Sequence, residues 1–124
     1  MYRVFLVEDS APILQRILEL LRAIDGVQVV GSASTARDAE RAILEAKPDA
    51  ALLDIKLAQG SGFEVLRSVH KQAPGIEIYM LSNFAAPPYR ARAASLGARG
   101  FFDKTTEIER LRTTMADRAA QFTH

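Results

Sequence analysis

Cysteine is absent from this sequence of 124 residues, so neither a disulfide framework nor a thiolate metal site can form. No apolar run approaches the length that spans a membrane. The opening apolar stretch, residues 4–7, is too short for a signal peptide and is followed too soon by acidic residues. We therefore expect a cytoplasmic protein that has no membrane partner.

A strong excess of charge is also missing. The chain has 16 Lys and Arg residues against 15 Asp and Glu residues, a formal net charge of +1. This balance gives no indication of direct binding to nucleic acid or to a membrane surface. With 48% hydrophobic and 25% charged residues, the composition is that of a folded globular protein. The length suits one domain over residues 1–124, and no second block of different composition is present.

Short apolar runs alternate with amphipathic helical patterns along the chain, which is typical of a parallel sheet built from βα units. The expected strands are residues 4–7, 27–33, 50–53, 76–81 and 98–102. We expect a helix over residues 11–24, three helices that open near Thr35, Phe63 and Pro87, and a last helix with apolar positions from Ile108 to Phe122. Ser10 and Thr35 are placed to cap the first two helices. The pattern predicts an α/β fold, with a short, alanine-rich fourth helix that has little apolar bulk.

Polar residues stand directly after four of these five strands. Glu8 and Asp9 follow the first strand, Asp54 the third, Ser82 the fourth and Lys104, after one further acid, the fifth. In open α/β sheets, a functional pocket forms beyond the carboxyl ends of the strands. We therefore expect one pocket that contains carboxylates, a hydroxyl and an ammonium group.

Three carboxylates in one pocket repel each other and raise each other's pKa unless a cation shares the site. Mg²⁺ prefers oxygen ligands and is commonly held by one or two carboxylates together with a phosphate oxygen. On their own, Glu8 and Asp9 would be explained as acids that favour the N-terminus of the next helix. Their combination with Asp54 and Lys104 favours a Mg²⁺ site.

Asp54 is the candidate nucleophile, because a carboxylate can attack phosphorus in line when a metal and an ammonium group neutralise the phosphoryl oxygens. Lys104 supplies that ammonium group, and Ser82 can donate a hydrogen bond to a phosphoryl oxygen. Each residue also has an ordinary interpretation, as a loop acid, a surface lysine and a turn serine. Phe101 is most simply explained as a core residue.

Four motifs together resemble the receiver domains of bacterial response regulators, and the resemblance covers essentially the whole chain. They are VEDS at residues 7–10, LLDIKL at 52–57 followed by GSGFEVL at 60–66, MLS at 80–82 and GARGFFDK at 97–104. The resemblance implies a flavodoxin-like three-layer sandwich of five βα units. Its parallel sheet would have the strand order 2-1-3-4-5.

The resemblance also implies a role in two-component signal transduction. Asp54 would accept a phosphoryl group from a sensor histidine kinase or a histidine phosphotransfer protein. Mg²⁺ would bind Asp9, Asp54 and the backbone carbonyl of Lys56, and Glu8 would act largely through water. The domain would be a phosphoacceptor that assists its own phosphorylation and dephosphorylation, not an enzyme.

A conformational switch is implied by the same resemblance. The Ser82 hydroxyl would move toward the phosphoryl group and the Phe101 ring would turn inward. These movements would reshape the face built by the fourth helix, fifth strand and fifth helix, which would bind a downstream protein target or a second copy of the chain. Such a switch is an equilibrium between two states that a local charge biases.

Several positions depart from the common pattern of the family. Ala58 and Thr105 stand where prolines are frequent, and we expect a trans bond before Thr105 because a cis bond without proline costs several kcal/mol. Asn83 is larger than the usual small residue at its position. Lys56 and Phe84 occupy positions that flank the route of the attacking water in this family. The last two residues therefore predict an altered lifetime of the phosphoryl group.

The leading hypothesis is a stand-alone receiver, with no output domain in this chain, that acts by binding a partner. One alternative is the amino-terminal receiver of a longer DNA-binding transcription regulator, which the loop at residues 57–62 suits. Another is a pseudo-receiver that is not phosphorylated, which requires a missing carboxylate or lysine, and none is missing. A flavin enzyme is least favoured, because three acids repel a cofactor phosphate unless a metal intervenes.

Overall fold

Strands and helices alternate along the chain, as the α/β class predicts. The computed structural model describes residues 1–122, so the last two residues of the expected 1–124 domain lie outside the described part. The strands are β1 (Tyr2–Val7), β2 (Val27–Ala33), β3 (Ala50–Leu53), β4 (Glu77–Ser82) and β5 (Gly100–Asp103). The helices are α1 (Ala11–Arg22), α2 (Ala36–Ala46), α3 (Gly62–Gln72), α4 (Pro87–Ser95) and α5 (Ile108–Gln121). Within the described range, every helix is too short or too polar to cross a membrane.

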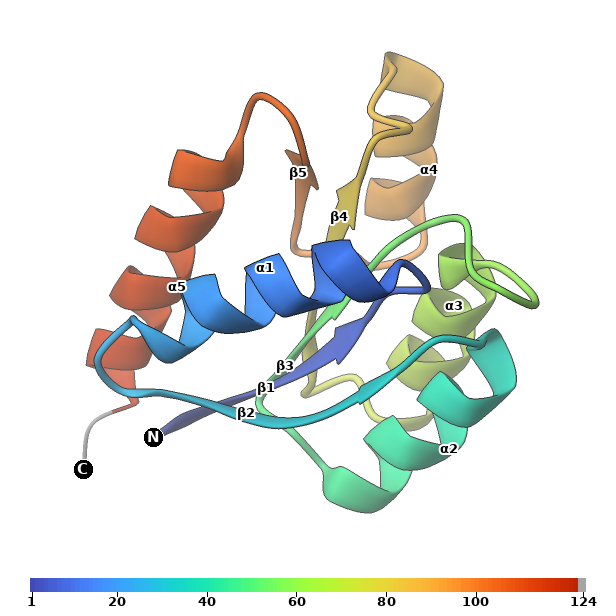
Figure 1. Ribbon diagram of the computed structural model, residues 1–124. Coiled ribbons are helices and arrows are strands. Elements are labelled where there is room, and N and C mark those ends of the chain that lie inside the picture. The colour runs from blue at the N-terminus through green and yellow to red at the C-terminus, as the bar shows by residue number, and fades with distance from the viewer. Residues whose placement is uncertain (123–124) are drawn as a thin grey trace.

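The five strands form one parallel sheet in the order β2-β1-β3-β4-β5. Helices α1 and α5 cover one face of the sheet, and helices α2, α3 and α4 cover the other (Figure 1). A hydrophobic core fills the space on each side. The structure confirms the predicted flavodoxin-like three-layer sandwich and its strand order.

Neighbouring residues of the two central strands enter opposite cores, because side chains alternate across a strand. Leu6 and Leu52 lie in the core beneath α1 and α5, whereas Val7 and Leu53 lie in the core beneath the other three helices. Each of these four side chains is at most 1% exposed. Burial on both faces explains why residues 4–7 of β1 and all four residues of β3 are continuous apolar runs in the sequence. The next polar side chains, those of Glu8 and Asp54, follow directly where these buried runs end.

Side-chain hydroxyls cap three helices at the carboxyl edge of the sheet. Ser10, Thr35 and Ser61 each accept a hydrogen bond from a backbone N–H in the first turn of α1, α2 and α3. Such bonds satisfy N–H groups that have no partner within the helix. The predicted caps at Ser10 and Thr35 are confirmed. The three caps fix the loops on this edge of the sheet.

Some element boundaries differ from the sequence prediction by one or two residues. Strand β1 begins at Tyr2 rather than at residue 4, because Tyr2 already pairs with β2. Helix α1 ends at Arg22 rather than at residue 24, and β4 is displaced by one residue. Strand β5 begins at Gly100 rather than at residue 98, because the N–H of Ala98 donates to the carbonyl of Ala93 and stays with α4.

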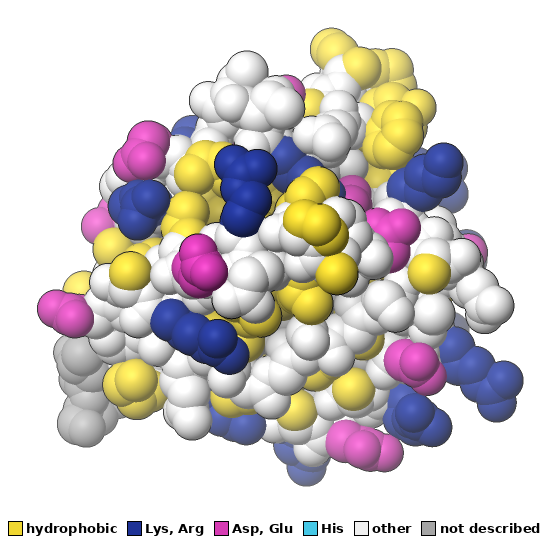
Figure 2. All heavy atoms as spheres, in the orientation of Figure 1, with side chains coloured by type: hydrophobic (Ala, Val, Ile, Leu, Met, Phe, Trp, Pro, Cys, Tyr) yellow, Lys and Arg dark blue, Asp and Glu magenta, His cyan; other side chains and the backbone are white. Residues whose placement is uncertain are grey.

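Helix α4 packs thinly against the sheet. Among its residues, Ala93 alone is buried, which agrees with the short helix of little apolar bulk that the sequence predicts. Phe84 and Tyr89, beside the start of α4, are 42% and 38% exposed. Figure 2 shows hydrophobic side chains gathered over this end of the helix, at the upper right. The segment around the start of α4 is therefore an exposed apolar part of the surface.

Candidate functional site

Acidic side chains gather at the carboxyl edge of the sheet, where β1 and β3 end. Glu8 and Asp9 follow β1, and Asp54 follows β3. One carboxylate oxygen of each acid lies within 4.8 Å of those of the other two. The acids share a pocket of about 160 Å³. The residues that line it are Glu8, Asp9, Ser10, Ile13, Asp54, Lys56, Asn83, Phe84 and Lys104.

Backbone hydrogen bonds fix the position of two of these acids. The N–H of Asp54 donates to the carbonyl of Val7 at 3.0 Å, and the N–H of Glu8 donates to the carbonyl of Ala33 at 3.0 Å. Both acids therefore extend the hydrogen-bond ladder of the sheet past the strand ends. Asp54 is 7% exposed, and its Oδ1 accepts a 2.7 Å hydrogen bond from the N–H of Ile55. Rigid backbone thus presents a nearly buried carboxylate to the pocket.

Lys104 enters the pocket from the loop after β5 and lies between two of the acids. Its Nζ is 2.5 Å from Oδ2 of Asp54 and also pairs with Oε1 of Glu8. The Lys104 side chain is only 8% exposed. The bond to Thr105 is trans, as predicted, because the described residues contain no cis peptide bond. The ammonium group is therefore held inside the pocket by two buried carboxylates.

The donor set of the pocket fits a hard divalent cation. Glu8 and Asp54 share the ammonium group of Lys104, whereas the exposed carboxylate of Asp9 has no hydrogen bond or ion pair within residues 1–122. All three groups offer oxygen atoms, which Mg²⁺ prefers. Three carboxylates so close together also leave negative charge that one buried lysine does not balance.

Burial and ion pairing shift the pKa values of two groups in the pocket. Burial raises the pKa of Glu8 above its usual range, although the hydrogen bonds from Lys104 and from the N–H of Ser10 act against this rise. Burial alone would lower the pKa of Lys104, but its hydrogen bonds to Asp54 and Glu8 outweigh burial, and the pKa is raised. Lys104 therefore stays positively charged at neutral pH.

The loop after Asp54 closes tightly around that residue. The N–H of Gly62 donates to the carbonyl of Ile55 at 2.7 Å. A Cβ atom on Gly62 would lie 1.9 Å from the carbonyl oxygen of Asp54, so only glycine fits without moving the backbone. The sequence has glycines on both sides of Ser61, at Gly60 and Gly62, which indicates a tight loop. It does not indicate which of the two lies against the backbone of Asp54.

The proposed switch residues, Ser82 and Phe101, do not line the acidic pocket. Ser82 is fully buried and is not among the residues that line the acidic pocket. Its Oγ accepts a 3.1 Å hydrogen bond from the N–H of Phe84. Phe101, on β5, is 7% exposed and packs in the core, and the guanidinium group of Arg90 lies 4.9 Å from the centre of its ring. The Phe101 ring is thus already inward in this structure.

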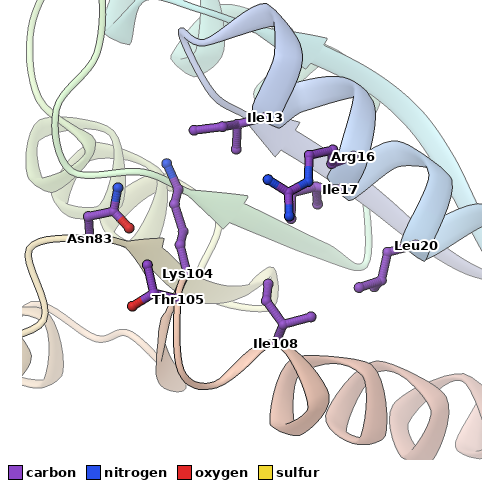
Figure 3. A pocket seen from close by; sticks show the side chains of 8 residues that line it. All are labelled: Ile13, Arg16, Ile17, Leu20, Asn83, Lys104, Thr105 and Ile108. Atoms are coloured by element: carbon purple, nitrogen blue, oxygen red, sulfur yellow. The ribbon is translucent and has the colours of Figure 1, made fainter.

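A second pocket opens beside the acidic one, between α1 and the start of α5 (Figure 3). Its volume is about 200 Å³. The residues that line it are Ile13, Arg16, Ile17, Leu20, Asn83, Lys104, Thr105 and Ile108. Ile13, Asn83 and Lys104 line both pockets. A mainly apolar groove therefore leads directly to the acids.

Known proteins match both the sequence and the fold. The family model described as the response regulator receiver domain matches residues 4–116. YvfU, a transcriptional regulatory protein of Bacillus subtilis, is 33% identical over 111 residues, which are 90% of this chain and 56% of that protein. The response regulator GacA of Pseudomonas aeruginosa is 30% identical over 111 residues, which are 90% of this chain and 52% of GacA.

A solved structure shows the same fold. The response regulator domain of Thermotoga maritima CheB superposes with a TM-score of 0.84 at 24% identity, over 98% of this chain and 95% of that one. The chain therefore belongs to the response regulator receiver domain family. It is a receiver domain of the kind found in two-component systems. The chain spans about half the length of YvfU and GacA.

Proposed function

We propose that Asp54 is the phosphoacceptor of this receiver domain. The observation that carries the proposal is the nearly buried carboxylate of Asp54, held 2.5 Å from the ammonium group of Lys104 and beside two further acids. In the transfer, a carboxylate oxygen of Asp54 forms a bond to phosphorus while the bond from phosphorus to the donor histidine nitrogen breaks. Lys104 neutralises a phosphoryl oxygen from its position between the acids.

Glu8, Asp9, Asp54 and the backbone carbonyl of Lys56 would hold Mg²⁺, with Glu8 acting largely through water. When bound, Mg²⁺ would neutralise phosphoryl oxygens and orient the group for in-line attack. The partnerless carboxylate of Asp9 supports this assignment, because it is the ligand that a cation can take without breaking an existing bond. Lys56 lines the same pocket.

Ser82 and Phe101 are the proposed switch residues, with the Phe101 ring already inward in this structure and the Ser82 hydroxyl still bound to the N–H of Phe84. For the Ser82 hydroxyl to reach a phosphoryl oxygen, the hydrogen bond that its Oγ accepts from Phe84 has to lengthen or break. The loop that carries Phe84 then moves with it, and this loop leads into α4. The α4–β5–α5 face is the surface that we propose for a downstream protein target or for a second copy of the chain. The domain would be a phosphoacceptor that assists its own phosphorylation and dephosphorylation.

The phosphoryl donor would be a sensor histidine kinase or a histidine phosphotransfer protein in the cytoplasm. We propose that the donor docks on the groove between α1 and α5, because three of its lining residues also line the acidic pocket. The apolar side chains Ile13, Ile17 and Ile108 give this groove a surface that an amphipathic helix can cover. A donor in the groove would hold its phosphohistidine beside Asp54.

A second candidate function is the receiver part of a longer DNA-binding transcription regulator. YvfU is named as a transcriptional regulatory protein, and the matched residues are 56% of its length. In that case phosphorylation would act on an attached output domain rather than on a separate partner. The length of the complete reading frame distinguishes this function from that of a stand-alone receiver over residues 1–124.

Incubation with acetyl phosphate and Mg²⁺, followed by intact-mass measurement, tests the proposed function. We expect one phosphoryl group on the wild-type chain and none on the Asp54→Asn variant. An Asp9→Asn variant, which keeps the nucleophile, should be phosphorylated more slowly. A wild-type chain that gains no phosphoryl group under these conditions would instead favour the pseudo-receiver.

A further inference from the structure

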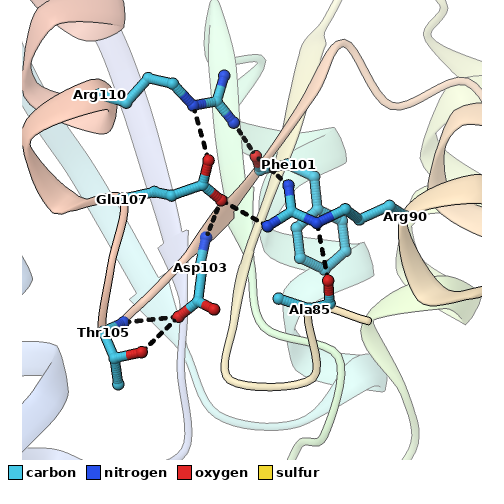
Figure 4. Close-up of polar contacts among 7 residues, drawn as sticks. All are labelled: Ala85, Arg90, Phe101, Asp103, Thr105, Glu107 and Arg110. Atoms are coloured by element: carbon cyan, nitrogen blue, oxygen red, sulfur yellow. Dashed lines mark hydrogen bonds and ion pairs between the residues drawn. The ribbon is translucent and has the colours of Figure 1, made fainter. Parts of the chain in front are cut away.

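One ion pair crosses the α4–β5–α5 face of the domain (Figure 4). Nη2 of Arg90, on α4, lies 2.5 Å from Oε1 of Glu107, which directly precedes α5. Both side chains also bind backbone groups. Nε of Arg90 donates to the carbonyl of Ala85 at 2.7 Å, and Oε1 of Glu107 accepts a 3.0 Å hydrogen bond from the N–H of Asp103. The pair therefore ties the loop after β4 to the last residue of β5.

These two backbone segments bracket the acidic pocket. Ala85 directly follows Asn83 and Phe84, which line the pocket, and Asp103 directly precedes Lys104. An Arg90–Glu107 contact therefore holds the loop after β4 and the end of β5, from which Lys104 follows, at the same time. Asp103 and Lys104 are adjacent in the chain, so anchoring the N–H of Asp103 also restrains the residue that carries the ammonium group.

Glu107 occupies the position of a helix cap but does not cap α5. Its carboxylate turns back toward β5, where Oε1 binds the N–H of Asp103. Its other oxygen, Oε2, accepts a 3.0 Å hydrogen bond from Nε of Arg110 on α5. The carbonyl of Phe101 accepts hydrogen bonds from the guanidinium groups of both Arg90 and Arg110. Both carboxylate oxygens of Glu107 thus accept hydrogen bonds, and the two arginines that bind them also bind the carbonyl of Phe101. These contacts fix the position of the Glu107 side chain between α4 and α5 (Figure 4).

The loop around Lys104 has a further support. Oδ1 of Asp103 accepts hydrogen bonds from the N–H and the hydroxyl of Thr105, at 2.8 and 2.7 Å. This turn surrounds Lys104 without the proline that is frequent at the next position in the family. Asp103 is therefore bound at its side chain by Thr105 and at its N–H by Glu107.

Exposed ion pairs usually contribute little, because water screens them and the side chains lose freedom. The pair between Glu109 and Arg112 on α5 is of that kind, with a distance of 3.3 Å and side-chain exposures of 82% and 44%. The Arg90–Glu107 pair differs, because its side chains are 36% and 24% exposed and each holds a backbone group in another element. Charge-assisted bonds of this type are shorter and stronger than neutral ones.

We propose that Arg90 and Glu107 form a clamp that positions Lys104 and the segment of Asn83 and Phe84 for phosphoryl transfer to Asp54. The proposal rests on the proposed function of Asp54. Both residues of the clamp are positioning residues, since neither lines the acidic pocket. Breaking the clamp frees the loop after β4 and the end of β5, so the ammonium group spends less time in the geometry that the transfer needs.

The test compares Arg90→Ala and Glu107→Ala with two matched controls, Arg112→Ala and Glu109→Ala. Phosphorylation is measured with acetyl phosphate and Mg²⁺, and amide hydrogen exchange at Asp103 is measured without Mg²⁺. We expect each clamp variant to lower the maximal phosphorylation rate about three- to tenfold, with little change in the half-saturating acetyl phosphate concentration. Exchange at Asp103 should become faster in both variants, and the controls should match the wild type.

A double variant that lacks both clamp residues should be no slower than the slower single variant, because the two residues act as one unit. Clamp variants that match the controls in rate and in Asp103 exchange would overturn the proposal. If the alanine variants do not fold, Arg90→Lys decides it, because one ammonium group cannot hold Ala85 and Glu107 in the same geometry. A wild-type chain that gains no phosphoryl group contradicts the proposed function instead, and Asp103 exchange still tests the clamp.

Discussion

The hydroxyl of Tyr2 donates a 2.6 Å hydrogen bond to Oε1 of Glu77. Both residues stand at the starts of their strands, so this contact lies at the edge of the sheet opposite to Asp54. Arg118 reaches both oxygens of the same carboxylate from α5, at 2.9 and 2.5 Å, and Arg99 lies 3.0 Å from Oε2. One nearly buried carboxylate thus joins β1, β4 and α5 away from the functional site.

Glu77 should make the stability of the fold depend on pH. Burial raises its pKa, but the bonds from Arg118 and Tyr2 and the charge of Arg99 lower the pKa more, so the net shift is downward. The stabilisation is therefore present above the unfolded pKa of about 4.3 and is lost as the pH falls through the folded value. We expect Glu77→Gln to lower the free energy of unfolding by about 2 kcal/mol at pH 7. Urea denaturation should show a smaller difference at pH 3, and an equal difference at both pH values would exclude the charge as its source.

Phe84 and Lys56 should control how long the phosphoryl group remains on Asp54. Both line the acidic pocket, and the Phe84 ring lies 5.7 Å from the ring of Tyr89. Phe84→Ala removes an apolar ring from the pocket and admits water, so dephosphorylation should become about threefold faster. Lys56→Asn should also be faster, because an amide can orient a water molecule. Loss of radioactive phosphate measures both rates, with Tyr89→Ala expected to have a smaller effect, and unchanged rates would refute the assignment.

Gly62→Ala should damage the fold and the site together. The added Cβ would lie 1.9 Å from the carbonyl oxygen of Asp54, so the backbone has to move. We expect a loss of about 3 kcal/mol in unfolding free energy, the upper range for overpacking. Gly75→Ala is the matched control, because nothing lies within 4 Å of its added Cβ. Chemical denaturation of the two variants measures the contrast, and similar losses would mean that contact with Asp54 is not the cause.

Asp9→Asn should weaken Mg²⁺ binding without destabilising the metal-free protein. The Asp9 carboxylate is exposed and has no partner within the described residues, so its loss breaks no bond of the fold. We expect the dissociation constant for Mg²⁺ to rise about tenfold, because ligand charge sets the affinity of such sites. Titration followed by NMR shifts of Asp54 and Lys104 measures it. Equal affinities of variant and wild type would remove Asp9 from the ligand set.

The sequence predicted the parts of the site that depend on strand ends. The apolar runs in β1 and β3 are followed directly by Glu8 and Asp54. The change from apolar to acidic residues in the sequence therefore marks the carboxyl edge of the sheet. Strand order did not follow from this pattern, because periodicity does not show which strands are neighbours. It was predicted only through the resemblance to receiver domains.

Contacts between distant side chains were not predicted. Arg90 and Glu107 are 17 residues apart, with Arg90 on α4 and Glu107 directly before α5, and Glu107 looks like an ordinary residue at the start of a helix. A hydrogen bond to the loop before α2 was not predicted either. The N–H of Ala58, which stands where proline is frequent, donates to the carbonyl of Ser34 at 3.0 Å. Such contacts depend on how loops meet in space, which neither composition nor periodicity encodes.

Helix α4 buries only one residue, Ala93, and the polar bonds of Arg90 join it to β5 and to the segment before α5. A shift of this helix therefore transfers little apolar surface between protein and water. Because apolar hydration dominates the heat-capacity change of conformational transitions, moving α4 should involve almost none. The enthalpy of such a movement would then be nearly constant with temperature. If K is the equilibrium constant between the two states of the proposed switch, a plot of ln K against 1/T should be straight.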